Sequence, residues 1–299
     1  MRPRFAYVNG RFVPYAEAAL PVEDRGVQFA DSVYEVWAAM AGELLDAGAH
    51  LQRLERNLRE LRIRMPMSAA ALSAILREAV RRNRVREGLV YVQITRGTAP
   101  RDPLFPPAAT PPTLIVIARP VDRAAAEARA AAGIAVALVP DDRWARCDLK
   151  TTALLPNLLA KEAARAEGAA EAWMVDGEGW ITEGASSSAW IIDAEGRLQT
   201  RPLGSEILPG VTRATVSRLA RNAGLEVVEA AFRPEAVLAA REAFTTSASG
   251  FVTPVVRLDG RELGDGRPGP VTLRLRNLYL DEVRNARRGR VFPHESSGS

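Results

Sequence analysis

The chain has 299 residues, 47% of them apolar, and a formal net charge of +4. These values are typical of a globular protein of one or two domains. No run of about 18 apolar residues occurs and the start carries no apolar segment, so neither a membrane-spanning helix nor secretion is expected. The single cysteine excludes an internal disulfide, and two histidines leave little for zinc. We therefore expect a cytoplasmic protein that binds no metal.

The sequence pI of about 9.6 raises the question of nucleic-acid binding. Acidic residues are interleaved with the arginines, however, and the densest basic runs, at 81–88 and 285–290, are typical of helix C-termini. Aromatic residues do not alternate with basic ones, so no surface for stacking single-stranded bases is apparent. We expect no nucleic-acid partner, and a nucleic-acid-binding protein remains only as the non-enzyme alternative.

The first 119 residues predict short strands and two helices. Asn9-Gly10 lies between two apolar runs and indicates a β-hairpin over 5–14. Leucines at helical spacing indicate a helix within 41–63, and a second helix is expected at about 68–86. Alternation from Ser32 onward predicts a strand with Tyr34 and Val36 on one side. Two more strands are expected at 88–95 and 112–120.

A change in composition, with prolines, divides the chain at about residue 120. We predict a smaller N-terminal domain at 1–119, a linker at 120–123 and a larger C-terminal domain at 124–290. Strands and helices continue to alternate in the second part, which ends with a helix at about 270–287. We expect residues 291–299 to form a disordered tail. The predicted class is α+β in two domains.

Lysine is almost absent, because Lys150 and Lys161 are the only lysines among 40 basic residues. Arginine supplies nearly all the basic side chains of this chain. A lysine at one position therefore suggests chemistry that a guanidinium cannot perform, such as Schiff-base formation. The local sequence leaves Lys150 as either a reactive amine or a chance survivor in a loop. Lys161 falls on the polar side of a predicted helix, where we expect a solvated surface cation.

Three further segments could carry charge or bind an anion. Glu183 precedes a glycine and serines that could keep its carboxylate ionised, although an exposed turn residue is equally compatible with the local sequence. Gly210-Val211-Thr212 begins a predicted helix whose free N–H groups favour a phosphate, although a helix cap without a ligand is the commoner case. The small-residue loop at 245–250 could donate to the same anion.

Together these segments resemble the class IV aminotransferases, enzymes of fold type IV that use pyridoxal 5′-phosphate (PLP), and within them the D-amino-acid group. The resemblance covers nearly the whole chain. It is carried by seven motifs in the family's order: DRGVQFADSVYE at 24–35, HLQRL at 50–54, TRGTAPR at 95–101, RWARCDLK at 143–150, ITEGASSS at 181–188, ILPGVTR at 207–213 and TSASGFVTPV at 246–255.

The resemblance implies a role in cofactor binding for nine residues. Lys150 would form the Schiff base with PLP, and Glu183 would bond the pyridine nitrogen. Leu208 would pack against the ring, with Ser186 and Ser187 at its edge. The phosphate would be held by Arg53, Val211, Thr212 and Ala248. The family often has threonine at the position of Ala248, so one hydroxyl donor is missing here.

The resemblance also implies the substrate contacts and the assembly. Tyr34 would point into the substrate pocket, and Arg101 would bind the substrate carboxylate from a loop that in the family crosses from the partner subunit. A homodimer is therefore implied. Pro103 stands where the best-known D-enzymes have a histidine, so the carboxylate contact is expected to be looser. The implied fold is a small N-terminal α/β domain and a larger barrel-like C-terminal domain, with PLP between them.

The expected activity is transfer of an amino group from a D-amino acid to a 2-oxo acid such as 2-oxoglutarate or pyruvate. Three alternatives share the implied fold: a branched-chain L-amino-acid aminotransferase, an (R)-amine transaminase and a 4-amino-4-deoxychorismate lyase. The sequence does not give the shape of the pocket, which decides among them.

Overall fold

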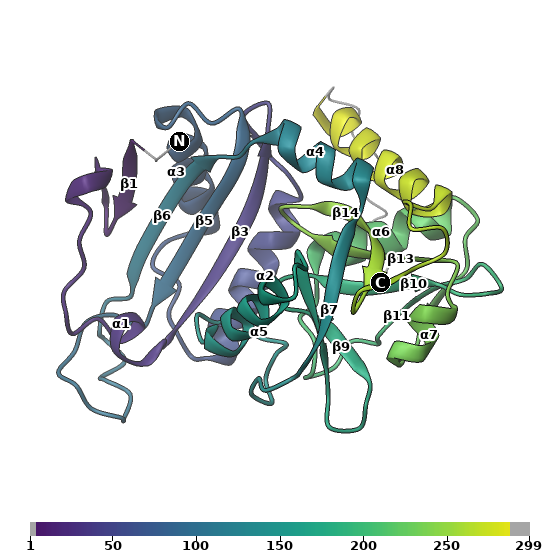
Figure 1. Ribbon diagram of the computed structural model, residues 1–299. Coiled ribbons are helices and arrows are strands. Elements are labelled where there is room, and N and C mark those ends of the chain that lie inside the picture. Colours follow the sequence, from purple (N-terminus) through teal and green to yellow (C-terminus); the bar gives the residue numbers. More distant parts are fainter. Residues whose placement is uncertain (1–3, 288–299) are drawn as a thin grey trace, which may run out of the picture.

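A computed structural model describes residues 4–287 of the chain. The tail predicted at 291–299 lies outside the described residues. Within residues 4–287 no helix combines the length and the apolar character needed to cross a membrane. Two β-sheets, one from each half of the chain, organise the described part (Figure 1).

The first sheet has six antiparallel strands in the order β2–β1–β6–β5–β3–β4. Its elements are β1 (Phe5–Val8), β2 (Arg11–Pro14), η1 (Tyr15–Glu17), α1 (Arg25–Phe29), β3 (Ser32–Met40), β4 (Glu43–Leu44), α2 (Ala47–Glu60), α3 (Ala69–Arg82), β5 (Glu87–Thr95) and β6 (Thr113–Pro120). Helices α2 and α3 pack against one face of this sheet, where Trp37, Leu54 and Leu72 are fully buried. The hairpin predicted at Asn9-Gly10 is confirmed, with positive φ at both residues.

Two boundaries in this half differ from the predictions. The helix expected to reach about residue 86 ends at Arg82, because the Asn83 side chain bonds the Phe5 backbone and the Ala79 carbonyl, and Arg84 is left-handed (φ 54°). The short helix α1 was not predicted. It is capped by Asp24, whose carboxylate accepts from the Gly26 N–H at 2.9 Å.

The second sheet has nine strands in the order β12–β11–β10–β13–β14–β7–β8–β9, with β15 paired to β14. Its strands are β7 (Ile134–Pro140), β8 (Glu171–Val175), β9 (Ile181–Gly184), β10 (Ser188–Ile192), β11 (Leu198–Thr200), β12 (Val227–Glu229), β13 (Glu242–Ser247), β14 (Phe251–Leu258) and β15 (Arg261–Glu262). The last strand of the row, β9, also lies beside β10, so the sheet curls into a barrel-like form.

Five helices accompany the second sheet: α4 (Arg123–Ala132), α5 (Leu155–Ala166), α6 (Val211–Asn222), α7 (Pro234–Ala239) and α8 (Pro270–Arg287). Helix α5 packs on β7 and β8, while α6 and α8 pack on each other and on β13. The protein is therefore an α+β fold with a smaller first part and a larger barrel-like second part. The change of sheet falls at the predicted linker, 120–123, and the division into domains with the stated limits stays a prediction.

The two sheets share one apolar cluster. Ala38 and Met40 at the end of β3 pack with Trp190 on β10 and Phe244 on β13, and all four are buried. The Trp190 and Phe244 rings stack at 5.4 Å. Because β3 contributes to both this cluster and the first core, the position of its side chains relative to the second sheet is fixed by packing.

A buried ion pair also joins the two halves. Arg53 on α2 donates from Nε and Nη2 to both carboxylate oxygens of Glu35, at 2.8 and 2.7 Å, and from Nη1 to the Pro209 carbonyl just before α6. Glu35 is fully buried and also contacts His50 Nδ1 at 3.0 Å. Burial alone would raise the pKa of Glu35, but the charge of Arg53 and the hydrogen bonds from His50 and Arg53 hold it well below its ordinary value.

Arg53→Ala should lower the free energy of unfolding by about 3 kcal/mol at neutral pH, because it leaves a buried carboxylate without its cation. A carboxylate with a depressed pKa stabilises the fold fully above its ordinary value, 4.5, and loses that contribution as the pH falls below it. The difference between wild type and variant should therefore shrink between pH 7 and pH 3 in urea titrations.

The matched control is Arg59→Ala, an exposed arginine on the same helix, which should change stability by less than about 0.5 kcal/mol. Equal losses in the two variants, or a loss that does not depend on pH, would mean that the Glu35 pair contributes nothing specific.

Candidate active site

A cavity of about 670 Å³ lies where the two sheets meet. Strands β3, β5 and β6 line it from one side, and segments around residues 150, 183–188, 208–213 and 246–249 line it from the other. Every predicted site residue except Arg101 lines this cavity: Tyr34, Arg53, Lys150, Glu183, Ser186, Ser187, Leu208, Val211, Thr212 and Ala248. The volume is ordinary for a small-molecule site.

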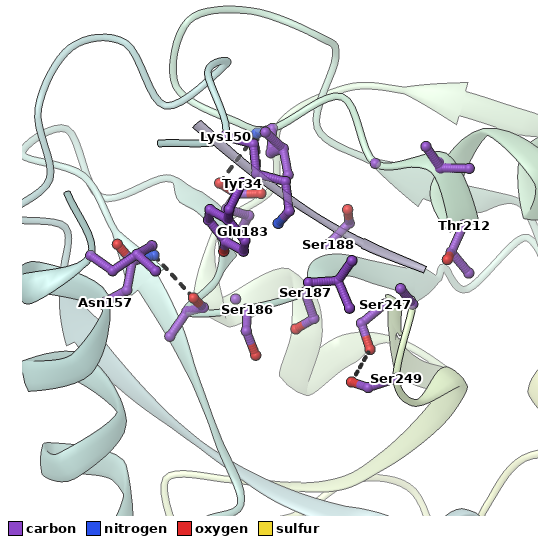
Figure 2. A pocket seen from close by; sticks show the side chains of 18 of the residues that line it. Tyr34, Lys150, Asn157, Glu183, Ser186, Ser187, Ser188, Thr212, Ser247 and Ser249 are labelled. Carbon is purple, nitrogen blue, oxygen red and sulfur yellow. Dashed lines mark hydrogen bonds between the residues drawn. The ribbon is translucent and has the colours of Figure 1, made fainter. Parts of the chain in front are cut away.

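Lys150 reaches the cavity because its backbone is paired with the first sheet. The Tyr34 N–H donates to the Lys150 carbonyl at 2.9 Å, and Thr151 forms a bridge with Val33. The alternation predicted for β3 is confirmed, since Tyr34 lines the cavity while Val33 is fully buried. The Lys150 Nζ lies 4.2 Å from the centroid of the Tyr34 ring (Figure 2). Within residues 4–287 this amine has neither an ion pair nor a hydrogen bond, so it is available to a ligand.

Glu183 is buried at the end of β9 and faces the cavity beside Lys150 (Figure 2). Its carboxylate pairs with Arg143 Nη1 and accepts from the Leu208 N–H at 3.2 Å. Arg143 in turn pairs with Asp141 at 2.8 Å. Burial raises the pKa of Glu183 to about 7, against the opposing charge of Arg143. The exposed-turn alternative for Glu183 is therefore wrong.

The N-terminus of α6 opens into the same cavity. The N-cap Gly210 has no side chain to bond the first N–H groups, and those of Val211 and Thr212 have no acceptor within the helix. Opposite lies the loop after β13, where the Gly250 N–H donates to Ser247 Oγ at 3.0 Å. A helix N-terminus without a cap, facing a small-residue loop, is suited to an anion.

The two serines after Glu183 are held by a carboxylate that was not predicted. Ser186 Oγ and Ser187 Oγ each donate to Glu171 Oε2 at 3.1 Å. Lys161 Nζ lies 3.6 Å from the other oxygen, Oε1. Lys161 lies at the surface as predicted, with its side chain 41% exposed, and its ammonium also pairs with the buried Glu171 because α5 packs on β8.

Four arginines line the cavity, and three of them have a carboxylate partner. Arg53 pairs with Glu35, Arg143 with Asp141 and Glu183, and Arg213 with Glu229 at 3.3 Å. Arg119, on β6, has no ion pair or side-chain hydrogen bond in the described part of the chain. Among these four guanidinium groups it is the one without a carboxylate partner in the described residues.

Arg101 does not line the cavity of its own chain, and its predicted contact with the pocket of a partner subunit stays a prediction. It is exposed on the loop between β5 and β6, with its guanidinium 5.2 Å from the Phe29 ring centroid. This loop extends away from the second sheet (Figure 1). It is anchored at its start by Arg96, which pairs with Asp31 at 2.8 Å.

Sequence reasoning missed Arg143, Glu171 and Arg119. Arg143 begins the RWARCDLK motif, and its place in that motif was a usable signal. Glu171 and Arg119 are single charged residues in predicted strands, and no local pattern distinguishes them from surface charges. Their roles follow only from the packing of the sheets.

Comparisons with known proteins agree with this geometry. Residues 32–258 match the family model described as amino-transferase class IV. The chain is 37% identical over 278 residues to a D-alanine aminotransferase of Staphylococcus haemolyticus, covering 92% of this chain and 97% of that protein. It is 36% identical over 275 residues to the D-alanine aminotransferase of Bacillus licheniformis, covering 92% and 95%.

Among solved structures, the branched-chain amino acid aminotransferase of Escherichia coli matches with a TM-score of 0.88 and 27% identity, covering 94% of each chain. That of T.th., solved with pyridoxamine 5′-phosphate, matches with a TM-score of 0.86 and 28% identity, covering 95% of each chain. The family model spans most of the chain, and the relatives match it almost from end to end. The chain belongs to the class IV aminotransferases.

Proposed function

We propose that this enzyme transfers the amino group of a D-amino acid to a 2-oxo acid, with 2-oxoglutarate or pyruvate as acceptor. The observation that carries the proposal is the unpaired amine of Lys150 in a cavity that also holds a buried carboxylate and an uncapped helix N-terminus. The D-alanine aminotransferases at 35–37% identity support the D-amino acid as donor.

The cavity fits PLP, the cofactor of this family. PLP combines an aldehyde, a pyridine nitrogen and a phosphate, and the cavity offers the Lys150 amine, the Glu183 carboxylate and the N–H groups of Val211 and Thr212. Arg53 keeps N–H groups beyond those bound to Glu35 and Pro209, and these could donate to the phosphate as well. When bound, PLP supplies an electron sink for negative charge at the substrate α-carbon.

The protein groups then position the substrate and move its proton. Lys150 Nζ lies over the Tyr34 ring and has no competing hydrogen bond, so it can accept the α-proton as a general base. Arg143 and the Leu208 N–H oppose the cost of burying the Glu183 charge, and a pyridinium nitrogen beside this carboxylate would favour its negative form further. Ser186, Ser187 and Leu208 complete the wall around the ring.

We further propose a homodimer, in which Arg101 of one subunit reaches the pocket of the other. Large apolar side chains are exposed on α5, where Leu155, Leu158 and Leu159 lie on one face, and on the loop that carries Arg101, at Leu104 and Phe105. Exposed apolar clusters of this kind mark protein interfaces. Cytoplasmic location stays a prediction from composition.

A branched-chain L-amino-acid aminotransferase is the second candidate. The solved structures most like this chain in fold include branched-chain enzymes, and the floor of the cavity is aliphatic at Val36, Leu89 and Ile117. Such a floor accepts a branched side chain. The two candidates differ in the enantiomer consumed, which a half-reaction with D-alanine and with L-leucine decides.

Lys150→Ala should give a folded protein that binds PLP without a covalent bond and has no transaminase activity, because the reactive amine is gone. Borohydride reduction of the wild type followed by peptide mapping should place the label on Lys150. The control Lys161→Ala should retain covalently bound PLP. Label on Lys161 in the wild type would show that the assignment is wrong.

Glu183→Gln should retain PLP but slow loss of the substrate α-proton at least about 100-fold, because a neutral amide cannot stabilise a pyridinium charge. Single-turnover kinetics with D-alanine separates this step from binding. A single-turnover rate equal to that of the wild type would remove Glu183 from the mechanism.

Arg101→Ala should lower kcat/KM for D-alanine about 100-fold, since a charge-assisted contact to the carboxylate is lost, and should change turnover of an (R)-amine much less. Arg119→Ala is the informative comparison, because Arg119 lines the cavity from the same chain. A larger loss in Arg119→Ala than in Arg101→Ala would place the carboxylate contact within one subunit. Reaction with L-leucine and none with D-amino acids would favour the branched-chain candidate.

A further inference from the structure

The hydrogen bonds around Glu171 determine how Ser186 and Ser187 face the cavity. A carboxylate has two oxygens with about four acceptor positions and no hydrogen of its own. In Glu171, Oε1 accepts from the Ala172 N–H at 3.0 Å and lies 3.6 Å from the Lys161 ammonium. Oε2 accepts from both serine hydroxyls at 3.1 Å. Each serine has one hydroxyl hydrogen, and both hydrogens are directed at Glu171.

The remaining lone pairs of the two hydroxyl oxygens are therefore free to act as acceptors. Both serines line the cavity, on the loop beside Lys150 and Glu183 (Figure 2). With their hydrogens engaged, these oxygens accept hydrogen bonds but do not donate them. A wall with this property binds an ammonium group and not a carboxylate.

The surrounding residues maintain this arrangement. Asn157 and Lys161 lie four residues apart on α5, on one face of the helix. Asn157 Nδ2 donates to the Ala185 carbonyl at 3.0 Å, which fixes the serine loop, and Lys161 compensates the charge of Glu171. Gly184 leaves the necessary space, since a Cβ there would lie 2.2 Å from Ser187 Oγ.

We propose that Glu171 is a positioning residue, which holds Ser186 and Ser187 as paired acceptors for the ammonium group of the amino donor. The proposal rests on the proposed function for the identity of that donor. Glu171 itself is buried and does not line the cavity, so it acts only through the two serines.

Glu171→Gln tests the proposal because it should turn the two serine hydroxyls from hydrogen-bond acceptors into donors toward the cavity. The Ala172 N–H donates to the Oε1 position and the Lys161 ammonium lies 3.6 Å from it, so the amide oxygen is favoured there. The amide NH₂ then faces the serines, which must accept from it and turn their own hydrogens toward the cavity. The side chain keeps its size, so the fold is retained.

The measurement is the affinity of the PLP-loaded protein for two unreactive ligands, determined by calorimetry. N,N-dimethyl-D-alanine carries an ammonium whose tertiary amine cannot condense with PLP, and isobutyrate has a methyl group in place of the ammonium of D-alanine. The wild type should bind the first roughly 10-fold more tightly, the size of one charge-assisted hydrogen bond. Glu171→Gln should abolish this preference while leaving isobutyrate binding within about twofold.

Two further variants separate positioning from general structural damage. Ser186→Ala combined with Ser187→Ala should also abolish the preference, and Glu171→Gln added to this pair should change nothing more, because Glu171 acts through the serines. Glu162→Gln, an exposed acid on α5 that pairs with Arg165, is the matched control and should keep the preference.

An undiminished preference in Glu171→Gln would overturn the proposal, and so would an equal loss of affinity for both ligands. The proposed function is tested separately by the wild type, through its reaction with D-alanine. A wild type that prefers the ammonium ligand but consumes no D-amino acid would contradict the proposed function and leave the role of Glu171 standing.

Discussion

The active site depends on the backbone pairing between β3 of the first sheet and the segment that carries Lys150 in the second half. The Tyr34 N–H and the Lys150 carbonyl form one hydrogen bond of this pairing, and Val33 and Thr151 form the adjacent bridge. Side chains alternate along paired strands, so this register sets Lys150 over the Tyr34 ring. A slip of one residue would turn the amine out of the cavity.

The polar groups in the wall of the cavity and directly behind it divide into those that have a partner and those that have none. Glu35, Glu183 and Arg143 are buried and have partners of opposite charge, which is how buried charges are normally tolerated. The Lys150 amine and the first N–H groups of α6 face the cavity without such partners. The paired groups give the site its rigidity, and the groups without partners are the ones that a ligand can engage.

Local sequence was sufficient for features that depend on neighbours in the chain. The hairpin at Asn9-Gly10, the alternation of β3 and the start of α6 at Val211 all follow from turn chemistry and periodicity. Glu171 could not be found this way, because it lies on β8, 15 residues before Ser186, which is in the loop between β9 and β10. Arg101 is the reverse case: a family motif predicts its role, but within a single chain Arg101 does not reach the cavity.

Because lysine is so scarce, reagents that modify side-chain amines can react at only two positions of the chain. Lys150 points into the cavity and Lys161 stands behind its serine wall, so the only two side-chain amines of the chain lie on either side of one layer of residues. Reagents that acylate or cross-link amines find no other lysine on the remaining surface. For this enzyme, attachment chemistry aimed at lysine side chains would therefore modify the active-site region.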